Sequence, residues 1–355
     1  MYNIHLLPAT FGDSILIEYG KDGDPKYILI DGGPYYQFDD IWSALQAAAP
    51  AITKIELLVV THIDIDHIDG IVKMLNQTNL PFTINEVWFN GREQLEQAAK
   101  FVGDDSLGSL QGEYLSRLIR EKKLPLNVSF GEKPVCIFDY NEKLPEVTLE
   151  GGMKITLLGP GVKDLADLIP VWDKELKGRD IEGEWADETR YADMLGEHVD
   201  QLMEEEHEPD DSEANRSSIA FLATYKGKTC LFAADSPTEN LQRSVQALLD
   251  RTGDELLEVD AWKLAHHGSK KSTQDGIMKL ISAPVVLVSS DGKRYKHPDE
   301  VVIAKLLKYK QGEISFYFNY RTKYNSMWDE AALKEEYGFE VFFPAGATPG
   351  VTIQL

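Results

Sequence analysis

The sequence predicts an α/β fold in which two β-sheets pack face to face between outer helices, an αββα sandwich. Segments typical of β-strands gather in two halves of the 355-residue chain. Segments with helical spacing of apolar residues separate them, which suits two packed sheets covered by helices. The apolar content of 43% and the charged content of 27% are ordinary for a globular protein with a sizeable core.

The first half of the chain opens with strands and a hairpin turn at Lys21-Asp22-Gly23-Asp24-Pro25. The segment 55–60, apolar except for Glu56, is typical of a strand that is buried on both faces of a sheet. The expected helices are 39–49, 68–76 and stretches up to about 123, and the expected strands are 2–7, 14–19, 27–30, 55–60, 87–89 and 147–158.

The second half of the chain returns to strand patterns after residue 217. We expect residues 1–310 to form one domain and residues 311–355 to form a C-terminal extension packed on it. The expected strands are 218–225, 229–233, 261–264, 285–288, 314–318 and two that flank 344–349, and the expected helices are 240–251, 300–308 and 327–337.

An acidic segment at about 161–214 interrupts this pattern. Between Asp180 and Glu213 there are fifteen acidic residues and one basic residue, Arg190. Such a composition is typical of a solvated helical insertion or a flexible loop. A lid or a docking segment for a protein partner is the functional alternative, and the sequence does not choose between them.

The charge balance and the chain ends restrict the class of protein. A net charge of −23 repels polyanions and counts against tight, unaided binding along duplex DNA. The two cysteines, Cys136 and Cys230, lie in apolar stretches and are expected to be buried thiols rather than a disulfide. We find no signal-peptide pattern and no apolar run of the roughly 20 residues that span a bilayer. The expectation is a soluble cytoplasmic protein without membrane association.

Four candidate metal ligands fall within six residues, directly after the apolar strand 55–60: His62, Asp64, Asp66 and His67. Imidazole and carboxylate are ligands that Zn²⁺ accepts, and carboxylates also suit Mn²⁺. The structural alternative is a polar turn in which Asp66 or Asp69 caps the next helix. Two histidines and two aspartates at the mouth of a buried strand favour the metal site.

Similar polar clusters follow other predicted strands. Asp235 ends one apolar strand, and His266-His267-Gly268-Ser269 ends the next. A further strand leads through Ser289-Ser290 to Lys296-His297-Pro298. Because several such clusters occur at strand ends, we expect them to assemble into a single site.

The motif His62-Ile63-Asp64-Ile65-Asp66-His67 resembles the His-x-His-x-Asp-His signature of the metallo-β-lactamase superfamily. Asp64 stands where the signature has its second His. With the His-His-Gly-Ser segment and the later His-Pro, this replacement resembles the branch related to the nuclease domain of the competence protein ComEC/Rec2. The segments 11–17 and 30–33, Phe-Gly-Asp-Ser-Ile-Leu-Ile and Ile-Asp-Gly-Gly, also match that branch, and the resemblance covers roughly residues 1–310. It implies a metallo-β-lactamase fold with an acidic insertion.

The resemblance implies a ligand set for two divalent ions, Zn²⁺ or Mn²⁺. His62 and Asp64 would ligate the first ion, Asp66, His67 and His266 the second, and Asp235 would bridge them. The position that supplies a third His to the first site is Asn215 here, so the first site is expected to hold its ion weakly. Two ions would stabilise the attacking and leaving oxygens and lower the pKa of a bound water.

Other residues receive supporting or substrate-binding roles. Asp66 could also accept a proton from the water, and His297 could protonate a leaving oxygen or could simply be a turn residue before Pro298. Asp31 is expected to be a buried support for the ligand loop rather than a ligand. The residues expected to contact substrate are Asn215, His267, Ser269, Lys270 and Lys296.

A basic stretch borders the predicted site. Between Lys263 and His297 there are seven basic residues, opposed only by Asp275 and Asp291, which predicts a positive rim suited to a phosphate-bearing substrate. The structural alternative is a set of scattered lysines that only keep the surface soluble. The basic residues are Lys263, Lys270, Lys271, Lys279, Lys293, Arg294 and Lys296.

Three functions remain open from the sequence. The first is metal-dependent hydrolysis of a phosphodiester in nucleic acid or a nucleotide. The second is hydrolysis of a small ester, lactone or thioester, because one fold serves many chemistries. The third is a non-catalytic interaction module, or an effector whose substrate a basic partner delivers.

Overall fold

Two large β-sheets form the centre of the molecule, in a computed structural model that describes residues 1–102, 114–177, 199–346 and 348–355. The first sheet has six strands and the second has eight. In order, the first contains β18 (Val351–Gln354), β1 (Tyr2–Leu6), β2 (Ile15–Lys21), β3 (Asp24–Ile30), β5 (Leu57–Val59) and β7 (Val87–Trp88). The second contains β17 (Phe339–Phe342), β16 (Ile314–Phe318), β15 (Val285–Val288), β13 (Ala261–Lys263), β11 (Lys228–Phe232), β10 (Ala220–Tyr225), β9 (Lys154–Gly159) and β8 (Glu146–Thr148).

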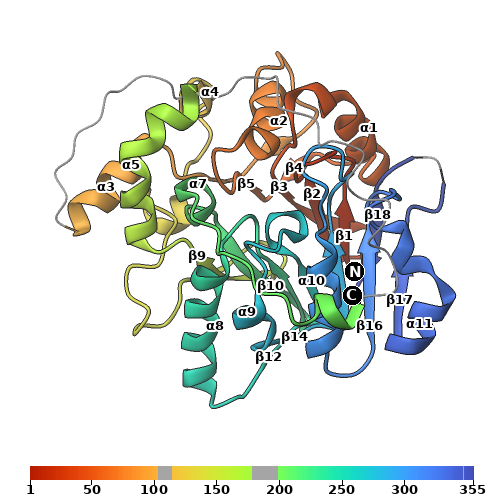
Figure 1. The fold of residues 1–355 in the computed structure, drawn as a ribbon. Coiled ribbons are helices and arrows are strands. Elements are labelled where there is room, and N and C mark those ends of the chain that lie inside the picture. The colour runs from red at the N-terminus through yellow and green to blue at the C-terminus, as the bar shows by residue number, and fades with distance from the viewer. Residues whose placement is uncertain (103–113, 178–198, 347) are drawn as a thin grey trace.

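Helices cover the outer faces of both sheets, so the predicted αββα class is confirmed. Figure 1 shows α1 and α2 with the early strands on one side, and α8, α9 and α10 with the later strands on the other. The helices are α1 (Phe38–Ala48), α2 (Ile65–Leu75), α3 (Arg92–Val102), α4 (Tyr114–Glu121), α5 (Val162–Lys177), α6 (Val199–Leu202), α7 (Glu213–Arg216), α8 (Thr238–Thr252), α9 (Asp275–Met278), α10 (Glu300–Tyr309) and α11 (Ala331–Tyr337). Shorter elements are β4 (Lys54–Ile55) paired with β6 (Thr83–Ile84), β12 (Leu257–Glu258) paired with β14 (Ile281–Ser282), and the 3₁₀ turns Tyr35–Gln37, Val128–Phe130, Ala265–Gly268 and Ser326–Asp329.

Alternate residues of the central strands enter two different hydrophobic cores. On β5, Leu57 and Val59 belong to the core that contains the second sheet, whereas Leu58 faces the core beneath α1, α2, α3 and α5. Successive side chains of a strand point to opposite faces, so a strand covered on both sides must be apolar throughout. This explains why residues 57–60 are all apolar, whereas the buried Glu56 before them pairs with Lys54 at 2.8 Å.

The ligand motif sits at the start of a helix rather than in the loop before it. The expected helix began at residue 68, but α2 begins at Ile65, so Asp66 and His67 occupy its first turn. Asp64 is the N-cap residue, and its carbonyl accepts the amides of His67 and Ile68 at 2.9 and 3.0 Å. Its side chain makes no capping hydrogen bond, and the carboxylate remains available to the site.

The acidic segment contributes three short or medium helices within the described residues. After β9, α5 packs against α3, and α7 follows the stretch that ends at Ser212. Residues 178–198, where much of the acidic charge was noted, lie outside the described residues.

The C-terminal residues add strands to both sheets. β16 and β17 extend the second sheet in parallel, and β18 pairs antiparallel with β1. The chain ends therefore meet, with the amide of Leu355 bonded to the carbonyl of Tyr2 at 3.0 Å (Figure 1).

Both cysteines are buried free thiols, as predicted. Among the described helices, none has the length and apolar character needed to cross a bilayer.

Candidate metal centre

The predicted ligands meet where strands of both sheets end. β5 leads into the loop that carries His62 and Asp64, β11 is followed by Asp235, and β13 by His266 and His267. The amide of Ile219 donates to the carbonyl of Thr61 at 2.9 Å and joins the ligand loop to the second sheet. The site is therefore a seam between the sheets, supported on both sides by buried strands.

Asp235 lies at the centre of four imidazole rings. Its Oδ1 atom is 3.4 Å from Nε2 of His67. Its Oδ2 atom is 4.0, 3.7 and 3.8 Å from the Nε2 atoms of His62, His266 and His267. Of the sequence-predicted residues, this one is placed where a bridging ligand would stand.

The other carboxylates approach the same rings. Asp64 Oδ2 is 3.6 Å from Nε2 of His62, and its side chain is 35% exposed, so it closes the cluster on the solvent side. Asp66 Oδ2 is 3.8 Å from Nε2 of His67 and 3.5 Å from Nε2 of His267. The potential ligand atoms form two overlapping groups: His62, His67 and Asp235, and Asp66, His67 and His267.

These spacings fit a metal centre. Two ligands that each lie 2.0–2.1 Å from a tetrahedral ion are about 3.4 Å apart, close to the distances between donors here. The Nε2 atoms of His62, His67 and His267 are buried and have no hydrogen-bond partner among the described residues. Buried polar atoms without a partner are costly, so a cation is the group that these nitrogens suit.

A second set of hydrogen bonds turns each ring so that Nε2 faces the centre. Asp31 Oδ2 accepts from Nδ1 of His67 at 2.8 Å and from the hydroxyl of Thr61 at 2.7 Å. That hydroxyl, having donated its proton, is 3.0 Å from Nδ1 of His62 and can accept from it. Asp31 thus lies behind the ligands, where a support and not a ligand was expected.

The two neighbouring histidines differ in their surroundings. His267 is fully buried, and its Nδ1 donates to the carbonyl of Ser289 at 2.9 Å. His266 is partly exposed, and its Nδ1 is 3.1 Å from Asp210 Oδ2. The sequence prediction gave His266 to the group of Asp66 and His67, whereas the ring that joins this group is His267.

The backbone holds these two rings in an unusual conformation. The φ angles of His266, His267 and Gly268 are +47°, +57° and +85°. Non-glycine residues at positive φ cost free energy and persist only where the surroundings enforce them. A Cβ atom on Gly268 would lie 2.8 Å from the ring of Pro298, so this turn also needs glycine for close packing.

The charges of the cluster are strongly coupled. Burial opposes ionisation, but the neighbouring imidazolium groups, His67 first, outweigh it and keep the pKa of Asp235 well below its usual range. Burial likewise opposes protonation of His267, yet Asp235 and Asp13 raise its pKa to about 9. Protons on the rings balance the carboxylates when no cation does so, and a metal ion would displace them.

Comparisons with known proteins agree with this architecture. Residues 7–162 match the sequence model of the metallo-beta-lactamase superfamily. The chain has the metallo-β-lactamase fold. Proteins of this superfamily are generally metal-dependent hydrolases, and the described residues include two groups able to hold a metal ion. No curated protein matches the chain.

The solved structures that match this chain share little sequence with it. The metallo-β-lactamase fold protein YhfI from Bacillus subtilis is 12% identical, with a TM-score of 0.43 over 99% of this chain and 98% of that one. A variant of the CmlA β-hydroxylase is 13% identical, with a TM-score of 0.41, and the present chain covers 54% of its length. A Cronobacter sakazakii metallo-β-lactamase with a HARLDQ motif is 17% identical, with a TM-score of 0.31 over 74% of this chain and 72% of that one.

One buried residue of the candidate metal centre was missed because it lies in the acidic segment. Asp210 Oδ2 accepts from Nδ2 of Asn215 and from the hydroxyl of Ser272, both at 2.7 Å. Burial opposes its ionisation, but these bonds and the one from His266 lower the pKa of Asp210 to about 2. Asn215 is therefore a buried partner of Asp210, with its Nδ2 3.3 Å from Nδ1 of His266. Among fifteen acidic residues, sequence alone offered no signal for this one.

A second missed residue lies beneath the ligands. Asp13 Oδ2 accepts from Nζ of Lys263 at 2.7 Å, and both side chains are buried. The preceding Gly12 lets the chain approach Asp66, whose carbonyl oxygen would be 1.9 Å from a Cβ atom there. Lys263 was expected in the basic rim, and that prediction is wrong, because β13 is buried along its length and directs the lysine inward.

The remaining predicted residues lie around the cluster at different distances. The His297 ring is 5.6 Å from the His266 ring, and its Nδ1 is 3.5 Å from Asp299 Oδ2. Ser269 is buried and organises the turn, with its carbonyl accepting the amide of Thr273 at 2.9 Å. Lys296 is partly exposed, at positive φ, one residue before His297.

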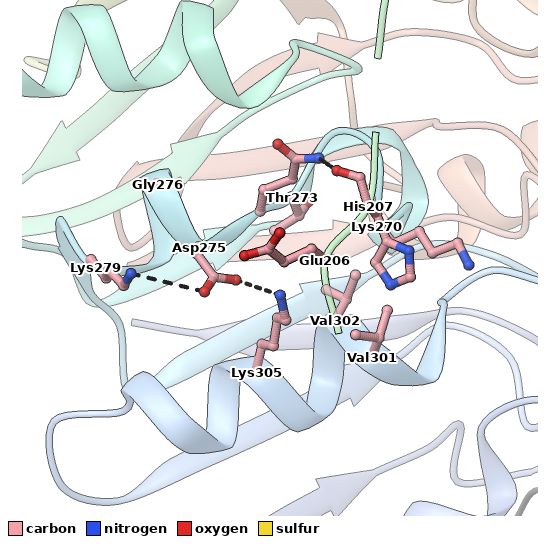
Figure 2. Close-up of a pocket in the computed structure, with 11 residues that line it drawn as sticks. Glu206, His207, Lys270, Thr273, Asp275, Gly276, Lys279, Val301, Val302 and Lys305 are labelled. Carbon is pink, nitrogen blue, oxygen red and sulfur yellow. Dashed lines mark hydrogen bonds and ion pairs between the residues drawn. The ribbon is translucent and has the colours of Figure 1, made fainter. Parts of the chain in front are cut away.

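Lys270 lines a separate cavity of about 310 Å³ behind the histidine turn. Figure 2 shows Asp275 between Lys279 and Lys305 on its floor, with His207 and Lys270 at the other end. Asp275 binds Nζ of Lys305 at 2.6 Å and the hydroxyl of Tyr309 at 2.6 Å. The negative charge of Asp275 is thus compensated by Lys305 and by the Tyr309 hydroxyl.

Proposed function

We propose that this protein hydrolyses phosphodiesters with the help of divalent metal ions. The observation that carries the proposal is the set of inward-facing imidazole nitrogens around Asp235, with carboxylates at 3.4–4.0 Å from them. A set of this kind suits one or two Zn²⁺ or Mn²⁺ ions.

His62, Asp64 and Asp235 would hold one ion, and Asp66, His67, His267 and Asp235 the other. When bound, the ions would supply stabilisation of negative charge on the phosphate and a more acidic water. We assign His267 to this set instead of His266, because its Nε2 atom is buried, unpartnered and 3.5 Å from Asp66.

Residues of the chain would move the protons. Asp66 would accept a proton from the attacking water, whose oxygen forms a bond to phosphorus while the bond to the leaving oxygen breaks. His297, across from His266, would donate a proton to that leaving oxygen. His266, partly exposed and oriented by Asp210, would bind a phosphate oxygen.

Two features favour phosphodiesters over esters, lactones or thioesters. Arg294 and Lys296 lie on the loop that carries His297, and phosphate binding favours such cations. The Asp64 replacement, the His-His-Gly-Ser turn and the His-Pro pair resemble the ComEC/Rec2 branch, which is a nuclease branch.

A substrate panel tests the proposal. The purified protein, supplied with Zn²⁺ or Mn²⁺, is assayed on bis-p-nitrophenyl phosphate, single-stranded oligonucleotides, a lactone and a thioester. Phosphodiester turnover that is lost in His267→Ala is the expected result, with Lys279→Ala, on the rim of the separate cavity, as the matched control. Turnover of the lactone or thioester without any phosphodiester cleavage would refute the proposal.

A further inference from the structure

A row of aromatic rings leads from the metal centre to the protein surface. The His297 ring lies 5.6 Å from that of His266 and 6.1 Å from that of Tyr295, with which it is stacked. The ring centroids of Tyr295 and Phe11 are 5.9 Å apart, and those of Phe11 and Tyr36 are 6.3 Å apart. Three separate segments of the chain therefore bring their aromatic rings into consecutive contact.

The outer members of this row are exposed to solvent. Tyr295 is 47% exposed and Tyr36 58% exposed, whereas Phe11 is buried between them at 5%. The hydroxyl of Tyr36 is 3.1 Å from that of Thr10, which fixes its position. Exposed aromatic faces that are held in place beside a site are typical of a binding surface.

A cation accompanies the rings. The guanidinium of Arg294 lies 4.7 Å above the Phe11 ring and 5.1 Å above the Tyr295 ring. Aromatic rings together with arginine are the groups on which unpaired nucleobases stack.

We propose that Tyr295, Phe11, Arg294 and Tyr36 form a nucleobase platform, on which a base of the substrate stacks while its phosphodiester lies at the metal centre. This inference rests on the proposed function and names its substrate class, an unpaired nucleotide or single strand. Tyr295 is one ring away from His297, so the base next to the scissile phosphate would stack there. Tyr36 would receive a base farther along the strand.

The choice of a base over a protein partner follows from position. Tyrosine and arginine are also common in protein interfaces. Here, however, the row includes the ring of His297, the candidate proton donor, so a ligand that stacks on Tyr295 would lie beside the candidate metal centre. The acidic surface also disfavours duplex DNA, whereas stacking adds affinity that does not depend on charge.

Two chromogenic esters with the same leaving group isolate the contribution of the base. Thymidine 5′-p-nitrophenyl phosphate carries a base, and methyl p-nitrophenyl phosphate does not. The kcat/KM ratio of the first to the second should fall by about 5- to 150-fold in Tyr295→Ala, the range of one base–aromatic stack. Tyr295→Phe should retain the ratio, because it keeps the ring.

Matched variants sharpen the comparison. Tyr35→Ala is the control, since Tyr35 is 56% exposed but contacts Lys73 instead of the row. It should leave the ratio unchanged, and Tyr36→Ala should lower it less than Tyr295→Ala does. An unchanged ratio in Tyr295→Ala, or equal losses for both esters, would overturn the platform.

A binding measurement separates this inference from the proposed function. If the wild type cleaves neither ester, phosphodiester hydrolysis fails, and the platform is judged by NMR titration with thymidine 5′-monophosphate. Binding at least fivefold weaker in Tyr295→Ala than in the wild type would support it. Equal affinities, or no binding to the wild type, would contradict it.

Discussion

The metal centre and the cavity of Figure 2 share one turn of the chain but differ in how their charges are paired. His266 and His267 face the centre, and Lys270, three residues later, lines the cavity. In the centre, three buried imidazole nitrogens have no hydrogen-bond partner among the described residues, whereas in the cavity Asp275 binds Lys305 at 2.6 Å. The difference teaches that buried nitrogens without a hydrogen-bond partner distinguish the candidate metal centre from a cavity whose charges are paired within the protein.

The largest expected difference between the two regions follows from removing the charge of Asp235, the central carboxylate of the candidate metal centre. Asp235→Asn should lower kcat/KM for a phosphodiester by about a thousandfold, or about 4 kcal/mol, because one amide cannot replace a charge shared by four imidazoles. Steady-state kinetics with a metal titration measures it. Asp275→Asn, in the cavity, is the matched control and should change kcat/KM by less than about twofold. Similar losses in both variants would mean that the centre has no special role.

The hydrogen bonds behind the ligands should have the next largest effect. Asp31→Asn replaces the acceptor of His67 Nδ1 and of Thr61, and supports of this kind contribute about 10- to 100-fold to metal affinity. Competition with a chromogenic chelator measures the loss. A metal affinity equal to that of the wild type would show that Asp31 does not support the ligands.

The sequence predicted the sandwich, and it identified most of the residues that the structure brings together at the candidate metal centre, because both depend on local sequence patterns. Apolar strands followed at once by His or Asp residues identified His62, Asp66, His67 and Asp235. The C-terminal strands were expected as elements, but their pairing with β15 and β1 connects residues far apart in the chain and has no local signal.

The roles of the residues that hydrogen-bond to the candidate ligands, and of the paired histidines, could not be predicted in the same way. His266 and His267 are neighbours in sequence, and only the left-handed turn decides which ring is buried against Asp66. Lys263 counted as a surface cation until its strand proved buried on both faces. Asp210 is one acid among many until folding brings it to His266.

A substitution in the cavity of Figure 2 should change the stability of the protein instead of its activity. Lys305→Met leaves Asp275 with Tyr309 and the more distant Lys279, and should cost about 1 kcal/mol of unfolding free energy. Urea denaturation measures this cost, with kcat/KM staying within about twofold. A large activity loss at unchanged stability would show that the cavity takes part in the reaction.

The smallest effect concerns Glu300, at the start of α10, close to this cavity. Burial, and then the charges of Asp299 and Glu205, raise the pKa of Glu300 to about 7. Between pH 4.5 and 7 the folded protein keeps a proton that the unfolded chain releases, so stability falls as the pH rises through this range. The loss should be about 1 kcal/mol, since solvent screens a half-buried group.

Glu300→Gln removes this titration. Its unfolding free energy should therefore decline less between pH 5 and pH 8 than that of the wild type, as urea denaturation at both pH values would show. Parallel declines in the two proteins would contradict the raised pKa.

The central claim is that the unpaired nitrogens around Asp235 hold metal ions. Anomalous diffraction from crystals grown with Zn²⁺ or Mn²⁺ tests it most directly, because it locates each ion. We expect one strong anomalous difference peak bounded by His67, Asp235, Asp66 and His267. A weaker peak should lie beside His62 and Asp64. Peaks confined to the acidic surface, with none at this cluster, would contradict it.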